Sequence, residues 1–257
     1  PDQSVISTDL CIVGAGAAGI TLAREFIGSG FQVCLLEAGG LEFDVETQSL
    51  YKGENLGFDD YPLDASRLRF LGGATNHWNG NIWPLFPDDF EKRDWIPDSG
   101  WPISRRDLDP YYEKAAVIAE LKGPYQWDPA QMTQYLQGIY SDKRLTSNTV
   151  LDRCFFQHSP PTRFGTTYRK DLETATNVQT YLYANAIGLQ ATDNGEAVNG
   201  VTVKCLDGRQ VTFRARYVVL AAGAIENARL LLVSDERVAG GLGNGHDLVG
   251  RYFSDHP

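Results

Sequence analysis

The sequence predicts an α/β fold in which a parallel sheet is extended by a three-stranded antiparallel meander. An apolar strand at 10–13, a glycine-rich turn, a helix and a second apolar strand at 31–36 follow one another within about thirty residues, as in a βαβ unit. Three alternating segments, 181–189, 198–205 and 210–215, are separated by Asn-Gly and Asp-Gly, which are the strongest short hairpin signals. These two patterns together predict one mixed sheet.

The other elements are predicted in chain order. Apolar residues at helical spacing predict a helix over 20–27, and the glycines that follow end it. Residues 53–101 are rich in Gly, Pro, Asp and aromatic residues, which indicates long ordered loops of the kind that are usually functional. A shared apolar face predicts a helix over 106–121. An all-apolar strand at 217–220 and a helix at 225–234 follow the meander.

Composition limits the classes of function. The 257 residues carry a formal net charge of −10, which argues against a nucleic-acid surface because such a surface needs clustered Lys and Arg. The longest apolar stretch, 218–225, is far below the ~18 residues that span a bilayer, so we expect a soluble protein with no membrane span. No signal-like segment begins the chain, and the compartment, cytoplasm or periplasm, stays open. Four cysteines without CxxC spacing predict buried unpaired thiols: Cys11, Cys34, Cys154 and Cys205.

The glycine-rich segment GAGAAG has the context of a dinucleotide site, with a strand before it and a helix after it. Gly14 permits the tight turn, Gly16 lets the backbone approach a pyrophosphate, and Gly19 lets helix and strand pack closely. Ala17 and Ala18 begin the helix, whose N-terminal N–H groups and positive dipole end favour phosphate. The segment therefore predicts a nucleotide-binding turn.

Glu37, followed by Ala38, ends the second strand about 20 residues after the turn, where a carboxylate accepts both ribose hydroxyls. A carboxylate there repels a 2′-phosphate, which disfavours NADP. A single-sheet NAD enzyme continues with further βα units, whereas this chain returns through the meander to a second small-residue turn. That turn consists of Ala221, Ala222 and Gly223 and allows another close approach to the nucleotide. We therefore expect FAD as the cofactor, with an NAD-binding module as the alternative.

With these residues in place, the chain resembles the glucose–methanol–choline (GMC) oxidoreductases. The stretches that carry the resemblance are DLCIVGAGAAGITLAREF, VCLLEAGG, RFLGGATNHWNG, WPISRRDLDPYYEKA, VVLAAGAIENARLLL and GHDLVGRYFSDHP. The form GGxxNHW looks like the bacterial sugar- and polyol-oxidising branch and is similar to the corresponding loop of pyranose oxidases. The resemblance implies FAD and the oxidation of a CH–OH group to a carbonyl.

The resemblance also implies cofactor contacts residue by residue. Arg69, Gly72 and Gly73 match a turn against the FAD pyrophosphate, and Ala186 matches a strand position that meets the adenine. The second nucleotide turn at 221–223 is joined by Asn227. Here the chain departs from many relatives, which have Thr-Pro or Ser-Pro where this chain has Glu226 and Asn227. The loop beside the flavin ring is matched by Thr75, Asn76, His77, Trp78 and Asn79.

Three roles are open for His77. In the similar pyranose-oxidase loop the histidine before Trp bonds covalently to the flavin, so a covalent FAD is the first. The others are a noncovalent flavin neighbour and a histidine that orders the loop. The remaining histidines, His158, His246 and His256, have no ligand cluster around them in sequence, so we expect no metal site.

The resemblance places the catalytic His–His or His–Asn pair beyond the equivalent of Pro257, so the catalytic residues of this chain are unknown. We expect the isolated chain to bind FAD poorly and to be inactive. It implies a small-molecule alcohol, sugar or polyol as substrate and oxygen, a quinone or a cytochrome as electron acceptor. The alternative is a flavin-binding half that works with a second polypeptide. The oligomeric state is left open.

The resemblance implies a Rossmann-like FAD-binding domain that is split by a substrate-side cap segment. We expect the FAD-binding domain over 1–85 and 178–257 and the cap over 86–177. Aromatic residues of the middle segment could stack on a sugar, but residues of this kind more often pack in a core or an interface. They are Trp95, Trp101, Tyr111, Tyr112, Tyr125, Trp127, Tyr135 and Tyr140.

Overall fold

The computed structural model describes residues 4–57, 61–122, 134 and 156–254. The chain divides into two compact units, one of residues 1–77 and 163–257 and the other of residues 78–162. A nucleotide domain and a cap, as functional assignments of these parts, stay predictions.

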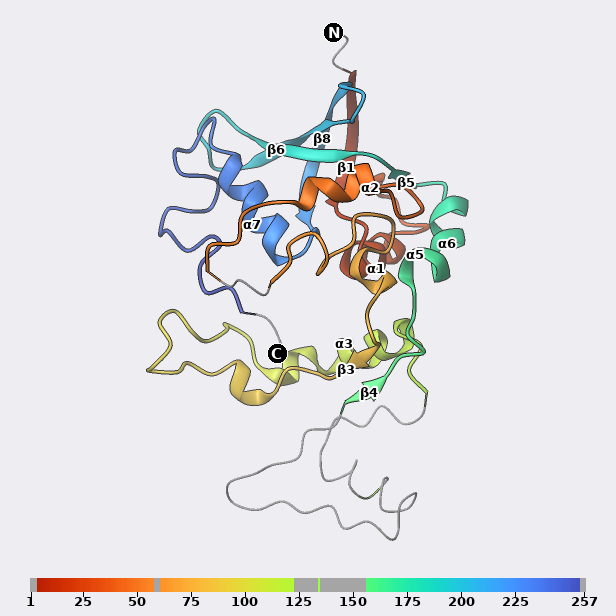
Figure 1. Cartoon of the computed structure of the whole chain (residues 1–257), viewed down its shortest axis with the longest axis vertical. Coiled ribbons are helices and arrows are strands. Elements are labelled where there is room, and N and C mark those ends of the chain that lie inside the picture. Colours follow the sequence, from red (N-terminus) through yellow and green to blue (C-terminus); the bar gives the residue numbers. More distant parts are fainter. Residues whose placement is uncertain (1–3, 58–60, 123–133, 135–155, 255–257) are drawn as a thin grey trace. The chain divides into compact units, whose positions relative to one another are not determined.

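The first unit is built on a six-stranded sheet with the strand order β5–β2–β1–β8–β7–β6 (Figure 1). Neighbours are parallel from β5 to β8 and antiparallel from β8 to β6. The βαβ unit and the meander are therefore confirmed, and β8 belongs to both. The strands are β1 (Ser4–Val13), β2 (Val33–Leu36), β5 (Val178–Tyr181), β6 (Asn185–Ala191), β7 (Val198–Lys204) and β8 (Gln210–Leu220).

Two predicted strand boundaries are wrong. The segment 181–189 is not one strand, because Tyr183 adopts a left-handed conformation with φ 56° and separates β5 from β6. These two strands lie at opposite edges of the sheet. Conversely, 210–215 and 217–220 form the single strand β8, which pairs with β7 in its first part and with β1 along nearly its whole length. The polar residues at 214 and 216 therefore do not interrupt the strand.

The sheet is curled, so that the meander helps to cover the parallel strands. Tyr181 on β5 and Phe213 on β8 have ring centres 4.9 Å apart, although β2 and β1 lie between them. Across three strand spacings a flat sheet would hold these positions about 14 Å apart. The rings belong to one apolar cluster with Cys11, Cys34 and Val201, and the alternate residues of β1 and β2 are also buried. Burial on both faces is typical of parallel strands.

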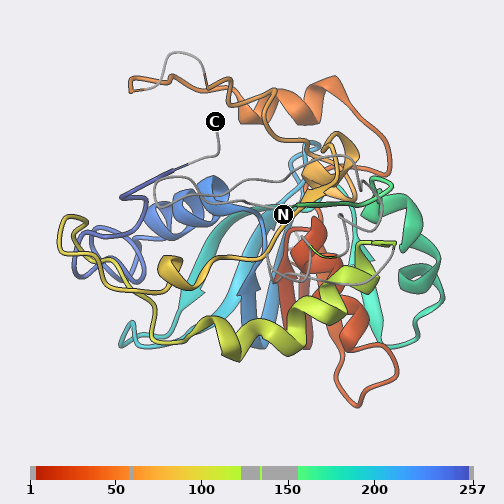
Figure 2. The ribbon, with the colours of Figure 1, turned by 90° about the horizontal axis from the view of Figure 1, so that it is seen from below.

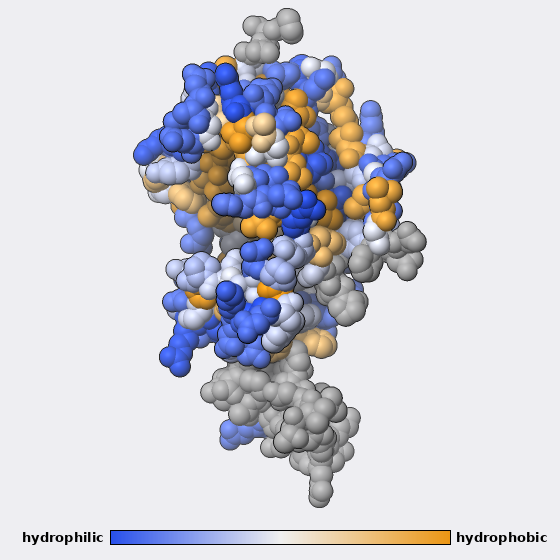
Figure 3. Space-filling model, turned by 90° about the vertical axis from the view of Figure 1, so that its left-hand side faces the viewer, coloured by the Kyte–Doolittle hydropathy of each residue, from blue (hydrophilic) through white to orange (hydrophobic). Residues whose placement is uncertain are grey.

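Short helices surround the strands of this unit. They are α1 (Ala17–Glu25), α2 (Val45–Gln48), α5 (Phe164–Thr167), α6 (Arg169–Thr174), α7 (Ala224–Val233) and the 3-10 turns η1 (Ser49–Tyr51) and η2 (Gly73–Asn76). The expected helices at 20–27 and 225–234 correspond to α1 and α7. Figure 2 shows α7 beside the meander strands, where Leu230 joins the apolar cluster. Apolar side chains also reach the surface of this unit and show as orange areas in Figure 3.

In its described part, the second unit contains the long helix α3 (Arg105–Ile118), which confirms the helix expected at 106–121. The helix begins with a capping box in which Ser104 N–H donates to Asp107 Oδ2 at 2.7 Å. Trp95 and Trp101 are 79% and 62% exposed, so they are not part of this unit's core. Tyr125, Trp127, Tyr135 and Tyr140 lie outside the described residues. The other elements among the described residues of this unit are β3 (Asn81–Ile82), β4 (Gln157–His158) and η3 (Pro87–Asp89).

Cys11 and Cys34 are buried free thiols, as expected, and burial raises the pKa of Cys11 to about 12. Cys205 is free but partly exposed, and Cys154 lies outside the described residues. The described helices include none of the length and apolarity that crossing a membrane requires.

Candidate functional site

A cavity of about 410 Å³ opens in the first unit at the carboxyl ends of β1, β2 and β8. This is the edge of an open α/β sheet at which ligands usually bind. Fourteen of the residues expected at the cofactor line it: Gly14, Gly16, Ala17, Ala18, Glu37, Ala38, Arg69, Gly73, Thr75, Ala186, Ala221, Ala222, Gly223 and Asn227.

The glycines of the turn after β1 differ in what requires them. Gly14 has φ 104°, and a Cβ there would lie 2.6 Å from the carbonyl oxygen of Ala221. A Cβ on Gly19 would lie 1.9 Å from the carbonyl oxygen of Gly14. At Gly16, by contrast, a Cβ would meet no atom within 4 Å, and the residue lines the cavity. Backbone packing therefore explains Gly14 and Gly19, whereas at Gly16 the fold leaves space.

Helix α1 points its N-terminus at this space. Gly16 is the N-cap residue and supplies no side-chain cap, and the first turn contains no acidic residue. Ala17 and Ala18 line the cavity, so the N–H groups of the first turn have no side-chain partner there. The positive end of the helix dipole and these donors favour an anionic group.

Glu37 bonds the backbone of the glycine turn after β1 and that of the segment after β2. Its side chain is 6% exposed, and Oε2 accepts a hydrogen bond from Ala15 N–H at 3.1 Å while Oε1 accepts one from Gly39 N–H at 2.9 Å. Burial raises the pKa of Glu37, and the backbone donors and Arg69 oppose that shift. A carboxylate has about four acceptor positions, so this group can accept further hydrogen bonds from a ligand.

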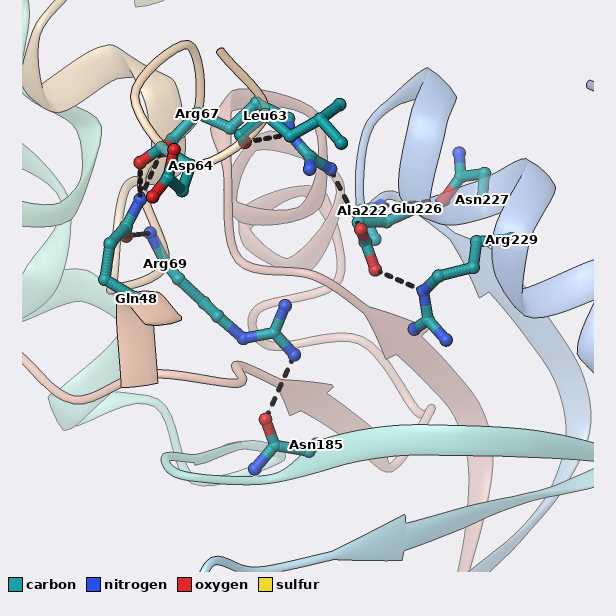
Figure 4. Close-up of polar contacts among 10 residues, drawn as sticks. All are labelled: Gln48, Leu63, Asp64, Arg67, Arg69, Asn185, Ala222, Glu226, Asn227 and Arg229. Carbon is teal, nitrogen blue, oxygen red and sulfur yellow. Dashed lines mark hydrogen bonds and ion pairs between the residues drawn. The ribbon is translucent and has the colours of Figure 1, made fainter. Parts of the chain in front are cut away.

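Arg69 is a buried cation with an unused donor. The residue is 9% exposed, and Nη2 donates to Asn185 Oδ1 at 3.0 Å, as Figure 4 shows. Nε is buried and has no hydrogen-bond partner in the described part of the protein. The guanidinium carbon lies 4.7 Å from the ring centre of Tyr51. Because buried polar groups are normally satisfied, this donor calls for an acceptor in the cavity.

The second turn is held by Asn227. Its Oδ1 accepts from Ala222 N–H at 3.0 Å, and its Nδ2 donates to the carbonyl oxygen of Leu220 at 3.3 Å. Gly223 has φ 85°, which only glycine adopts easily. The Asn227 amide therefore braces the turn itself and lines the cavity, and its contact with a nucleotide stays a prediction.

Sequence reasoning missed a charged group on the cavity wall. Arg67 Nη1 lies 2.9 Å from Glu226 Oε1, and Arg229 Nε lies 2.8 Å from Glu226 Oε2 (Figure 4). Burial alone would raise the pKa of Glu226, but Arg229 and Arg67 outweigh it and hold the pKa below the ordinary value. Tyr51 also lines the cavity, under Arg67 at 4.0 Å. The signal in the sequence was the departure at Glu226.

Six expected residues do not line the cavity. Gly19 and Gly72 are two of them, and Gly72 N–H donates to the carbonyl oxygen of Ala15 at 2.8 Å. Asn76 Nδ2 donates to the carbonyl oxygens of Leu71 and Gly73, so it orders the loop. The other three are His77, which is exposed, and Trp78 and Asn79, which belong to the second unit. Their roles at a flavin stay predictions.

The described residues contain no cluster of three or more His, Cys, Asp or Glu side chains that could hold a metal ion. His158 lies on β4, and His256 lies outside the described residues.

The chain is similar to curated oxidoreductases over nearly its whole length. It is 25% identical to 2-methyl-1,2-propanediol dehydrogenase of Mycolicibacterium austroafricanum, covering 98% of this chain and 56% of that protein. It is 24% identical to the large subunit of fructose dehydrogenase of Gluconobacter japonicus, covering 99% and 59%. The chain is a homologue of the GMC-type oxidoreductases. No family model matches it.

A solved structure has a similar fold to the chain. Formate oxidase superposes with a TM-score of 0.57 at 18% identity, covering 90% of this chain and 48% of formate oxidase. At that identity the likeness concerns the fold. The chain spans about half the length of the curated GMC-type relatives that it matches.

Proposed function

We propose that this chain is the FAD-binding part of a GMC-type oxidoreductase that oxidises the CH–OH group of a small alcohol, sugar or polyol to a carbonyl. The observation that carries the proposal is the single cavity that joins the glycine turn, Glu37 and the second turn at 221–223. The names of the relatives support the substrate class, because one is a diol dehydrogenase and another a fructose dehydrogenase.

The residues of the cavity fit the ADP half of FAD. Gly16 leaves room for a pyrophosphate against the backbone, and the first turn of α1 supplies N–H donors. Glu37 supplies a buried carboxylate for ribose hydroxyls. Arg69 Nε is a buried donor without an acceptor in the described part of the protein, and an oxygen of the nucleotide would satisfy it.

FAD, when bound, supplies the acceptor for the hydride that leaves the alcohol carbon. The chain's own residues bind and orient the nucleotide. The α1 N-terminus and Arg69 balance phosphate charge, and Glu37 holds the glycine turn against the segment after β2. The lining of the cavity includes no histidine, so the proton acceptor that the resemblance implies is not among these lining residues.

Covalent attachment of FAD to His77 is part of the proposal to be tested separately. His77 is exposed at the end of η2, which leaves its ring accessible. Digestion with trypsin and mass spectrometry of the whole flavinylated protein decide it. A His77 peptide with no flavin mass contradicts the covalent bond and leaves noncovalent FAD.

Identifying the electron acceptor also requires an activity assay on the whole protein. Relatives include dehydrogenases, and formate oxidase shares the fold, so the proposal covers oxygen, a quinone or a cytochrome. Oxygen consumption during sugar or polyol oxidation, compared with reduction of a quinone analogue, separates them.

The experiment that tests the cofactor is a titration of the 257-residue chain with FAD, ADP, riboflavin and NAD, followed by calorimetry. We expect ADP and FAD to bind measurably, FAD less tightly than to a whole protein, and riboflavin not to bind, because the cavity residues fit the ADP half. Binding of NAD without FAD would contradict the proposal and favour the nicotinamide alternative.

A further inference from the structure

The wall of the nucleotide cavity joins two segments that are far apart in the sequence. Segment 61–69 contributes Arg67 and Arg69, and helix α7 contributes Glu226 and Arg229. Arg67 and Glu226 are separated by 159 positions and meet through an ion pair. Figure 4 shows the Glu226 carboxylate between the two arginines that it binds. Arg67 belongs to segment 61–69, and Arg229 belongs to α7.

This ion pair is shielded from water. The side chains of Arg67 and Glu226 are 16% and 12% exposed, whereas Arg229 is 46% exposed. Each oxygen of the Glu226 carboxylate has its own arginine, and the Arg67 guanidinium lies over the Tyr51 ring. Removing one partner from such a pair leaves a poorly solvated charge, so the pair is coupled more strongly than a surface ion pair.

Segment 61–69 is also held by Gln48, the last residue of α2. Gln48 Nε2 donates to the carbonyl oxygens of Asp64 and Arg67 at 2.6 and 2.7 Å, and its Oε1 accepts from Arg69 N–H at 2.9 Å (Figure 4). One side chain thus holds the backbone at both Arg67 and Arg69. A bond from Arg67 to α7 therefore also fixes the side of the cavity on which Arg69 lies.

We propose that Glu226 is a positioning residue that joins segment 61–69 to α7 across the cavity and thereby slows nucleotide release. This inference rests on the proposed function, because it takes FAD as the occupant of the cavity. Glu226 acts through Arg67 and Arg229. Without the Glu226 carboxylate, segment 61–69 loses its ion pair with α7, and we expect the nucleotide to leave faster.

The test measures FAD release from the 257-residue chain by flavin fluorescence after addition of excess ADP. Glu226→Gln and Arg67→Met should each speed release about tenfold to a hundredfold, the range for lost hydrogen bonds to charged groups. The double variant should be no faster than the faster single one, because both changes break one pair. Arg67→Lys, which keeps the charge, should restore part of the slow release.

Glu236→Gln is the matched control, since Glu236 is an exposed carboxylate just after α7 and outside this cavity. The association rate and the fraction of chains that bind FAD are measured in parallel. A positioning role changes the release rate, whereas a loss of folded protein lowers the fraction of chains that bind. Unchanged release in Glu226→Gln, with tight binding by the wild type, would overturn this inference alone. A wild-type chain that binds neither FAD nor ADP would overturn both this inference and the proposed function.

Discussion

Gly16→Ala tests whether the space at the glycine turn serves a ligand. Gly16 has φ −82° and ψ −165°, an extended conformation that alanine adopts without strain. A Cβ there meets no atom within 4 Å, so the fold tolerates the added methyl group. Because alanine has fewer unfolded conformations than glycine, the free energy of unfolding should rise by about 0.4–1 kcal/mol.

Nucleotide binding should change in the opposite direction. The methyl group would occupy the part of the cavity where we propose that the pyrophosphate approaches the backbone. Crowding of a packed site by one methyl group costs about 1–3 kcal/mol, so FAD should bind about tenfold to a hundredfold more weakly. Calorimetric titration with FAD gives the affinity, and denaturant unfolding without nucleotide gives the stability.

Two glycines serve as controls. A Cβ on Gly30 also meets no atom within 4 Å, and Gly30 does not line the cavity, so Gly30→Ala should leave FAD affinity unchanged. A Cβ on Gly19 would lie 1.9 Å from the carbonyl oxygen of Gly14, so Gly19→Ala should destabilise the fold by about 3 kcal/mol or more. If the Gly16→Ala chain binds FAD as tightly as the wild type, the space at Gly16 does not hold the pyrophosphate.

Three further predictions follow from the charged groups of the site. Glu37→Gln should weaken ADP binding by about tenfold or more in calorimetry, because an amide accepts weaker hydrogen bonds than a carboxylate. Glu42→Gln, at an exposed position, should leave ADP affinity unchanged. Equal ADP affinities of the wild type and Glu37→Gln would contradict the role of Glu37. Arg69→Met should lower the flavin retained on gel filtration, since the buried Nε donor is lost; full retention would show that the donor does not meet the nucleotide. The pKa of Glu226 is lowered in the fold, so its contribution to stability is present above its ordinary pKa of 4.5 and lost as the pH falls through the lower folded value. Denaturant unfolding of wild type and Glu226→Gln should therefore differ at neutral pH and converge in acid, and a constant difference would contradict this assignment.

The local parts of the fold were predictable because their signals lie within short stretches of sequence. The helix after the glycine turn, the two hairpin turns of the meander and the helix after Gly223 were all read correctly from periodicity and turn residues. The break at Tyr183 was not, because Tyr has no special preference for φ above zero. Its conformation is set by the chain passing the end of β2, where Tyr183 N–H donates to the carbonyl oxygen of Gly39.

The candidate site likewise has features that local sequence predicts and features that only the folded chain creates. The glycine turn and the carboxylate at Glu37 were predictable from local sequence, because a strand, a tight turn and a helix in succession bring those residues to one edge of the sheet. The pairing of Arg67 with Glu226 and the unpartnered Nε of Arg69 were decided by the tertiary structure alone. They depend on the path of segment 61–69 over the sheet and on where β8 delivers α7, and no local pattern specifies contacts across 159 positions.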